Sequence, residues 1–321
     1  TSKISSFFYG WMYGYGYFLS NLYWISISLT FDPSFNYLIP FSIILVPAFL
    51  AIFYGLITTL FLFFRPSGIL STFFLFSLLF GLIEFIRGNI FTGFPWNLIV
   101  YSLSNKVTFI SIISLIGTYS LNLIVITFFS APGILLLRRS KKEISVLSFL
   151  FLLSLIFLNY GFLYKKSFLE KDIKKNPIIF RVLGSNINLD RFYKKGETES
   201  VIKELIEISN PDSKKKIFFI WPEGIIPDVY QEELYLYKDI FDSNFNKNHI
   251  IGLGINHKEK KNGTKKYFNT FSVFDSDLNL LSDYHKIKLV PFGEFLPFES
   301  ILEMIGLKTL TNNYQSFSKG T

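Results

Sequence analysis

Glu223 is a carboxylate in the middle of an apolar stretch. The stretch reads IFFIWPEGII over residues 217–226, and Glu223 stands between a proline and a glycine with no basic residue beside it. Burying a charge is costly unless the charge is paired. We therefore expect other parts of the chain to supply its partners.

A second stretch, YHKIKLVPFGEFLPFE over residues 284–299, carries suitable partners. Lys286 and Lys288 emerge from a strand-like run, and the Pro-Phe-Gly turn that follows presents Glu294 in a loop. A surface ion pair is the alternative interpretation of these residues.

The composition is typical of a membrane protein with a soluble part. Half of the 321 residues are hydrophobic, 19% are aromatic and only 17% are charged, and the mean hydropathy is positive. The net charge of +8 comes with no basic stripe and no nucleic-acid-binding module. We expect membrane lipids as partners, and no nucleic acid.

Several kinds of site are excluded or disfavoured by residue type. The 321 residues contain no cysteine, so they hold no disulfide, no thiolate metal site and no thiol nucleophile. The three histidines lack the spacing of a zinc-binding helix. Gly10 and Gly14 lie inside an apolar run, at a spacing that lets membrane helices pack closely, and do not form a phosphate loop. We expect no metal and no cofactor.

Five apolar runs fill the first half of the chain. They cover residues 7–29, 38–64, 69–86, 107–137 and 144–162. Each is near or above the roughly 20 residues that a helix needs to cross a hydrocarbon core of about 30 Å. We predict five membrane-spanning helices in a transmembrane domain over residues 1–164.

The short loops predict the orientation of these helices. Arg65 and the basic loop at residues 138–142 fall on the same side after five crossings, and the positive-inside rule makes that side cytoplasmic. Everything after about Tyr164 then lies outside the cytoplasm. Lysines at residues 165–175 give a competing signal, but long domains translocate largely regardless of charge.

From residue 176 the pattern changes to short strand-like runs between polar turns. The segment ESVIKELIEISNP has Val201, Leu205 and Ile208 at helical spacing before Asn210 and Pro211 end it. The strand-like runs are IIFRVLGSNI, KKIFFIWPEG, HIIGLGIN, YFNTFSVFD and LNLLSDYHKIKLV, with an Asn-Gly hairpin turn at residues 262–263. Alternating helix and strand predicts an α/β domain over residues 165–321.

The segment EFIRGNIFTGFPWN, residues 84–97, lies between the third and fourth apolar runs. As an interfacial loop, it would have Arg87 snorkelling to the surface, Glu84 pairing with it one turn away and Trp96 anchoring at the headgroup level. The alternative is a lipid entrance beside the external domain. On physical grounds alone the interfacial loop is favoured.

Together the motifs resemble a known family. Four blocks match in order: GWMYGYGYFLSNLYWISIS, EFIRGNIFTGFPWN, IWPEGIIP and YHKIKLVPFGEFLPFES. They resemble the apolipoprotein N-acyltransferases, bacterial inner-membrane enzymes whose external domain belongs to the nitrilase, or carbon-nitrogen hydrolase, superfamily. The blocks extend over nearly the whole chain. The resemblance implies a multi-pass helical membrane bundle plus an incomplete nitrilase-like α-β-β-α sandwich.

The resemblance also implies roles for individual residues. Glu223 would be the general base, Lys286 would stabilise the oxyanion, and Glu294 would be a supporting carboxylate. Lys288 is interpreted as structural. Residues expected to bind substrate are Trp221, Tyr193 and Trp96.

The sequence departs from the family pattern in two ways. The family nucleophile is a cysteine, which these residues lack, so we expect a fragment without the early membrane helices and without the C-terminal part that carries the cysteine. The alternative is a degenerate protein that has lost the nucleophile. Gly224 stands where serine or threonine is more usual, Tyr193 where tryptophan is usual, and Asn188-Leu189 replaces a common Pro-Gln. These changes put details of the substrate loop in doubt.

The function implied by the resemblance is acyl transfer. A phospholipid would donate a fatty acyl chain through a thioester to the N-terminal amine of a diacylated apolipoprotein, at the periplasmic side of the bacterial inner membrane. We expect a monomer. The alternatives are a membrane-anchored amidohydrolase, in which water resolves the acyl-enzyme, and a non-catalytic membrane scaffold.

Overall fold

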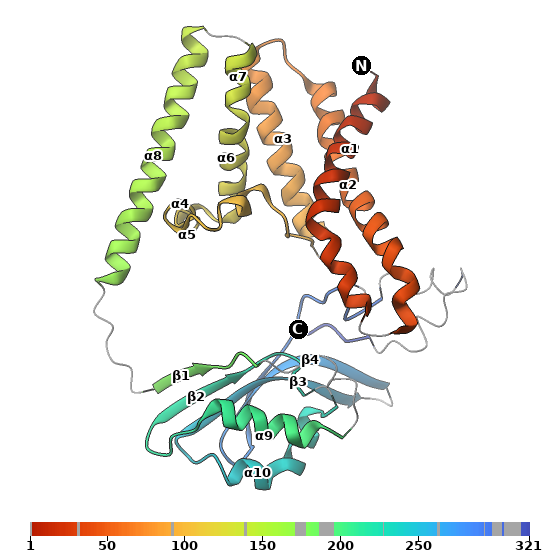
Figure 1. Cartoon of the computed structure of the whole chain (residues 1–321), viewed down its shortest axis with the longest axis vertical. Helices are drawn as coiled ribbons and strands as arrows, with labels where there is room; N and C mark the ends of the chain where they lie inside the picture. The colour runs from red at the N-terminus through yellow and green to blue at the C-terminus, as the bar shows by residue number, and fades with distance from the viewer. Residues whose placement is uncertain are drawn as a thin grey trace. The chain divides into compact units, whose positions relative to one another are not determined.

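The computed structural model of the chain divides into two compact units, residues 1–172 and 173–321 (Figure 1). We describe each unit by itself. The structure describes residues 2–30, 33–90, 93–137, 140–170, 178–185, 196–226, 228–261, 264–291, 293–296, 304 and 316–321.

The first unit is helical. Four of its described helical segments are long and apolar enough to cross a membrane: Phe35–Phe64, Ile69–Asn89, Thr118–Leu136 and Lys141–Leu169. The helices are α1 (Lys3–Leu22), α2 (Ile39–Phe64), α3 (Ile69–Asn89), α4 (Val107–Ile110), α5 (Ile113–Ile116), α6 (Thr118–Ser130), α7 (Pro132–Leu137) and α8 (Lys141–Leu169). Short 3₁₀ helices cover Tyr23–Thr30, Pro33–Leu38 and Ile99–Leu103.

The prediction of five spans needs two corrections. The run at residues 107–137 is not one helix: α4 and α5 are single turns, and Gly117, at φ 78°, separates them from α6. A positive φ breaks the α-helix, and hydropathy does not register it. The first run forms a helix only as far as Leu22, and α1, which carries serine, glycine and tyrosine residues, is not among the four segments.

Close packing of α1 against α2 confirms the expectation for two glycines. A Cβ added at Gly10 would lie 2.3 Å from the Tyr54 carbonyl oxygen, and one added at Gly14 would lie 2.8 Å from Tyr54 Cβ. Among the described residues, Gly16 has no such neighbour within 4 Å. Gly10 and Gly14 therefore let the two helices touch along one line, as small residues do in membrane bundles.

The loop after α3 differs from its prediction in one respect. Glu84 and Arg87 do form an ion pair, with 3.3 Å between Oε1 and Nη2. Arg87 does not snorkel to the surface. It is only 1% exposed, and its Nη1 donates to the carbonyl oxygens of Phe94 and Trp96. Trp96 is half exposed. A lipid entrance at this loop stays a prediction.

The second unit is built on one five-stranded sheet. Its strands are β1 (Ile178–Val182), β2 (Lys216–Trp221), β3 (His249–Lys261), β4 (Thr264–Phe274) and β5 (Leu280–His285), in the order β1-β2-β3-β4-β5. The pairs β1-β2 and β2-β3 are parallel, and β3-β4 and β4-β5 are antiparallel. All five predicted strand regions are therefore confirmed. The predicted turn at Asn262-Gly263 lies outside the described residues.

The described helices of the second unit are α9 (Thr198–Ser209), α10 (Lys238–Asp242) and the 3₁₀ helix Gln231–Tyr237. Val201 and Leu205 of α9 pack in the core as predicted, and Asn210 ends the helix in a left-handed conformation. Ile208 is 42% exposed, so the core-facing stripe uses Ile202 and Ile206 instead.

The helices cover one face of this sheet. Ile217, Phe219 and Trp221 of β2 point into the core that α9 and α10 share. The alternate residues form the other face, whose side chains are half-buried or exposed. They include Phe180, Val182, Phe218, Ile220, Phe271, Val273 and Tyr284.

Candidate active site

Glu223 lies in the turn that follows β2. Two glycines shape this turn. Gly224 adopts φ 63°, which favours glycine. Gly254 of β3 lies directly against the turn, since a Cβ there would come within 2.5 Å of Glu223 Cα. The Glu223 carboxylate, with a side chain 63% exposed, is thus held at the end of the sheet.

Lys286 follows the last residue of β5. Its backbone N–H donates to the carbonyl oxygen of Asn269 on β4, which continues the strand pairing by one residue. Its Nζ lies 3.2 Å from Glu223 Oε1 and 2.8 Å from Glu294 Oε1. The structure therefore brings together the three residues that the two motifs indicated.

Glu294 is fixed by its own turn. Its N–H donates to the Val290 carbonyl oxygen at 2.8 Å, and its Oε2 accepts from the Val290 N–H at 2.7 Å. Its carbonyl oxygen accepts from Phe317 N–H at 2.7 Å. The carboxylate is buried. Because Val290 occupies Oε2, it is Oε1 that accepts the hydrogen bond from Lys286.

Asn269 is a member of this cluster that sequence reasoning missed. Its side-chain nitrogen Nδ2 lies 2.6 Å from Glu223 Oε1 and 2.6 Å from Glu294 Oε1. Both donors, the amide and the lysine ammonium, thus bridge the same two carboxylate oxygens. We call Glu223, Asn269, Lys286 and Glu294 the carboxylate cluster. The one available signal was an asparagine in the strand-like run YFNTFSVF.

Hydrogen bonds within the carboxylate cluster favour the charged forms of Glu223 and Lys286. The hydrogen bond from Asn269 is the largest cause that lowers the pKa of Glu223. Burial raises this pKa, and the hydrogen bond and positive charge of Lys286 lower it further. Burial on its own would lower the pKa of Lys286, but its hydrogen bonds and charge interactions with Glu294 and Glu223 outweigh burial and raise that pKa. At neutral pH Glu223 is therefore a carboxylate and Lys286 an ammonium.

This arrangement has the parts of an acyl-transfer site except the nucleophile. Glu223 is the more exposed carboxylate and can take a proton, while Lys286 offers a cation to a developing oxyanion. The 321 residues supply no thiol to attack a carbonyl. Within the described residues, no three His, Asp or Glu side chains are grouped so that they could hold a metal ion.

The remaining predicted site residues lie elsewhere. Trp221 is 2% exposed and packs in the core, where its indole N–H donates to Ser209 Oγ at 3.0 Å, so the structure supports a packing role for it. Tyr193 lies outside the described residues. Trp96 belongs to the helical unit. Lys288 is exposed and outside the carboxylate cluster, and its structural role stays a prediction.

Comparisons with known proteins agree with the motifs. Residues 1–131 match the family model of the apolipoprotein N-acyltransferase N-terminal domain. Curated relatives named apolipoprotein N-acyltransferase include those of Brucella melitensis (28% identity, 97% of this chain, 59% of the relative), Allorhizobium ampelinum (28%, 98%, 60%) and Caulobacter vibrioides (27%, 98%, 60%). The chain spans about 60% of the length of these relatives.

The similarity covers both units, because the matched part includes the helices as well as the sheet that carries the carboxylate cluster. It confirms the resemblance that the four sequence blocks carried. The chain is similar to the apolipoprotein N-acyltransferases over nearly its whole length.

Proposed function

We propose that the protein acts as an apolipoprotein N-acyltransferase. The observation that carries this proposal is the carboxylate cluster, in which Lys286 Nζ lies between Glu223 and Glu294. The same chain has, among the described residues of its first unit, four helical segments long and apolar enough to cross a membrane. The substrates would be a phospholipid acyl donor and a diacylated apolipoprotein acceptor. Both are anchored in a bilayer, so a membrane-bound enzyme meets them at high effective concentration.

In the proposed mechanism, Glu223 accepts the proton of a cysteine thiol as the sulfur attacks the ester carbonyl of the phospholipid. Lys286 stabilises the oxyanion of the tetrahedral intermediate, and Glu294 orients Lys286. Collapse breaks the ester bond, and Glu223 returns the proton to the lysophospholipid oxygen. The acceptor amine then attacks the thioester, its proton passes to Glu223, and the thiolate leaves. The complete protein would have to supply the cysteine.

We further propose that the second unit is part of a nitrilase-like α-β-β-α sandwich, a partial carbon-nitrogen hydrolase domain. One face of its sheet is covered by helices, and the other face is apolar without a covering layer among the described residues. Phe180 and Tyr284 on that face are 57% and 55% exposed. Exposed apolar area of this kind is typical of a surface that packs against another layer. A second sheet would meet that requirement.

The proposed location is the bacterial inner membrane, with the second unit on the periplasmic side. The α2–α3 connection, which carries Arg65, and the α7–α8 connection, which leads into Lys141 and Lys142, lie at the same end of the helical unit (Figure 1). The positive-inside rule makes that end cytoplasmic. Helix α8 then leads to the opposite side, where the α/β unit begins. We propose a monomer.

The decisive experiment uses the protein expressed from the full reading frame that encodes this chain. Incubated with a phospholipid and a diacylated lipopeptide, it should yield a triacylated lipopeptide and a lysophospholipid in equal amounts. Glu223→Gln should fold normally and form no acyl-enzyme, because it keeps the shape of the side chain and removes the base. Lys288→Gln, outside the carboxylate cluster, is the matched control and should keep full activity.

Each other outcome supports a different function. Free fatty acid without triacylated product would indicate an amidohydrolase-like enzyme in which water resolves the acyl-enzyme. No turnover of either kind, with no cysteine encoded anywhere in the reading frame, would indicate a non-catalytic scaffold. Wild-type acyl-enzyme formation by Glu223→Gln would refute the role given to Glu223.

A further inference from the structure

Two buried charged side chains in the helical unit are not used by the proposed mechanism. Glu84 and Arg87 of α3 are 0% and 1% exposed and form an ion pair at 3.3 Å. Charges inside a membrane bundle are costly and mark functional positions more often than packing positions. An apolar pair of similar volume would pack at least as stably as a buried ion pair. Helix packing alone therefore does not account for Glu84 and Arg87.

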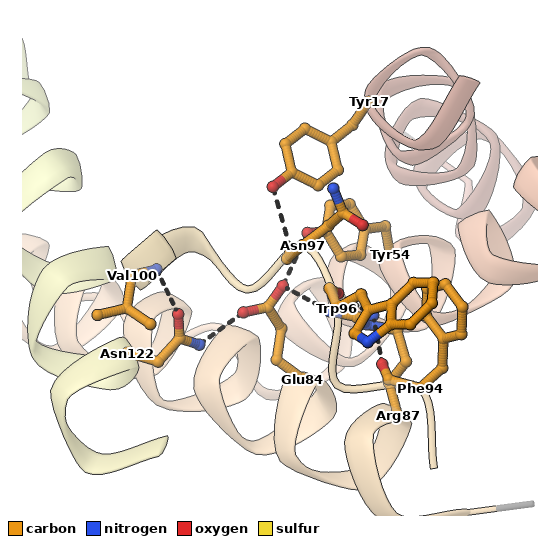
Figure 2. Close-up of polar contacts among 9 residues, drawn as sticks. All are labelled: Tyr17, Tyr54, Glu84, Arg87, Phe94, Trp96, Asn97, Val100 and Asn122. Carbon is orange, nitrogen blue, oxygen red and sulfur yellow. Dashed lines mark hydrogen bonds and ion pairs between the residues drawn. The ribbon is translucent and has the colours of Figure 1, made fainter. Parts of the chain in front are cut away.

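Glu84 connects three helices. Its Oε1 accepts from the Tyr54 hydroxyl of α2 at 2.9 Å, and its Oε2 accepts from Asn122 Nδ2 of α6 at 2.5 Å (Figure 2). Arg87 Nη2 donates to the same Oε1. We call Tyr54, Glu84, Arg87 and Asn122 the Glu84 network.

The Glu84 network also holds the loop that follows α3. Arg87 Nη1 donates to the carbonyl oxygens of Phe94 and Trp96 at 2.8 and 2.9 Å (Figure 2). Asn122 Oδ1 accepts from the Val100 N–H at 2.9 Å. The guanidinium therefore joins Glu84 on one side to two loop carbonyls on the other, a task that suits its planar fork of donors.

The backbone of this loop needs such support. Asn97 adopts φ 58°, in the left-handed region that costs energy for residues other than glycine. Its carbonyl oxygen accepts from the Tyr17 hydroxyl of α1 at 3.0 Å (Figure 2). With the two bonds from Arg87 and the one to Asn122, residues 94–100 are held by side chains of α1, α3 and α6.

The loop held by these hydrogen bonds exposes the side chain of Trp96. It is 49% exposed, and its ring stacks on Trp24 at 5.2 Å between centroids. Trp24 is itself 43% exposed, and its N–H donates to the Asn21 carbonyl oxygen. Tryptophan side chains favour the membrane–water interface, where an apolar ring and a polar N–H are both accommodated.

We propose that the Glu84 network is a positioning device for this tryptophan pair. Glu84 holds Arg87, Arg87 holds the loop through two carbonyl oxygens, and the loop keeps Trp96 stacked on Trp24 against lipid. Arg87 and Glu84 are thus positioning residues that act through the loop. The activity consequence rests on the proposed function, whereas the position of Trp96 does not.

The test removes the charges as a pair so that no unpaired charge is left buried. The variant Glu84→Gln/Arg87→Met keeps the side-chain volumes and should remain folded in detergent, with a thermal midpoint near that of the parent. Arg87→Lys is the conservative variant, and Lys142→Met removes an exposed charge of the same unit as the matched control. Trp96→Phe provides the reference signal for the loop.

The first readout is quenching of tryptophan fluorescence by nitroxide-labelled phospholipid, after reconstitution into phosphatidylcholine vesicles. In the parent and in Lys142→Met, the Trp96 contribution, defined by subtraction of Trp96→Phe, should be strongly quenched. In Glu84→Gln/Arg87→Met this contribution should shift and lose most of its quenching. Arg87→Lys should lie between them, because a lysine keeps the charge but cannot reach both carbonyls and Glu84 together.

The second readout is acyl transfer by the complete protein. The paired variant should lose about tenfold or more in kcat/KM for the phospholipid, as expected for a misplaced binding element. An unchanged quenching pattern in the folded paired variant would overturn the proposal. If that variant does not fold, unchanged quenching in Arg87→Lys would overturn it instead. Absence of acyl transfer in the parent would contradict the proposed function and leave the quenching test decisive.

Discussion

The side-chain amide of Asn269 donates a 2.6 Å hydrogen bond to the carboxylate of Glu223, 46 positions earlier in the chain. The two residues lie on different elements, one within β4 and one in the turn after β2. The same amide nitrogen reaches Glu294. Asn269 therefore adds a neutral donor beside the cation of Lys286, and its hydrogen bond stabilises the ionised form of Glu223 without adding charge.

The first prediction concerns this hydrogen bond. Asn269→Ala removes the largest cause of the lowered pKa of Glu223 and leaves burial, which raises it. The acid limb of the pH–rate profile for acyl-enzyme formation should lie below the ordinary glutamate value of 4.5 in the parent and move upward in the variant. Asn256, the cross-strand neighbour of Asn269, provides the control variant Asn256→Ala. Coincident profiles for all three proteins would contradict this role of Asn269.

The second prediction separates the two lysines of the HKIKL segment. Lys286→Met leaves Glu223 and Glu294 without their cation and should reduce acyl-enzyme formation by about a hundredfold or more, as loss of an oxyanion-stabilising group does. Lys288→Met should change the rate less than about twofold, since exposed charges outside a site contribute little. Single-turnover assays of thioester formation measure both. Similar losses in the two variants would show that net charge matters, not position.

Sequence reasoning brought Glu223, Lys286 and Glu294 together because each stands in a short motif with its own turn residues. Asn269 has no such local mark, since its partners lie 46 and 25 positions away. An asparagine on a strand looks like any polar residue on an exposed face. Its role depends on the antiparallel pairing of β4 with β5, which places it opposite Lys286.

In the helical unit, too, features set by local sequence were predictable, and contacts between distant residues were not. Apolar runs predicted where helices lie, but the run at residues 107–137 contains Gly117, whose positive φ ends one segment and starts another. Arg87 was expected at the membrane surface because arginine commonly snorkels. Its acceptors are backbone carbonyls of a loop, and sequence pattern does not reveal where backbone oxygens point.

The third prediction is a stability window in pH. Glu223 has a lowered pKa in the folded state, so its contribution to stability is present above the unfolded value of 4.5 and is lost as pH falls through the folded value. Lys286 has a raised pKa, so its contribution is present below 10.5 and is lost as pH rises through the folded value. Thermal midpoints of the parent and of Glu223→Gln/Lys286→Met should differ between these limits and converge at both extremes. A constant difference across pH would contradict the predicted linkage.

The fourth prediction tests the support of Glu223. Gly254→Ala would place a Cβ 2.5 Å from Glu223 Cα, so the turn must move. A 1 Å displacement of a catalytic group can cost about a hundredfold in rate, so acyl-enzyme formation should fall far more than the thermal midpoint. Gly184→Ala is the control, because no atom of the described residues lies within 4 Å of its added Cβ and its φ is not in the left-handed region. Equal activity of the two variants would show that the turn adapts freely.

The last prediction concerns the contact of α1 with α2. Gly14→Ala places a Cβ 2.8 Å from Tyr54 Cβ, and Tyr54 also donates to Glu84, so the substitution should disturb both the helix contact and the Glu84 network. Gly16→Ala, two residues after Gly14, meets no atom of the described residues within 4 Å and replaces glycine by a better helix former. In detergent, Gly14→Ala should therefore lower the thermal midpoint, and Gly16→Ala should leave it unchanged or raise it. A drop of the same size in both variants would show that helix propensity, and not the contact with Tyr54, determines the stability of this pair.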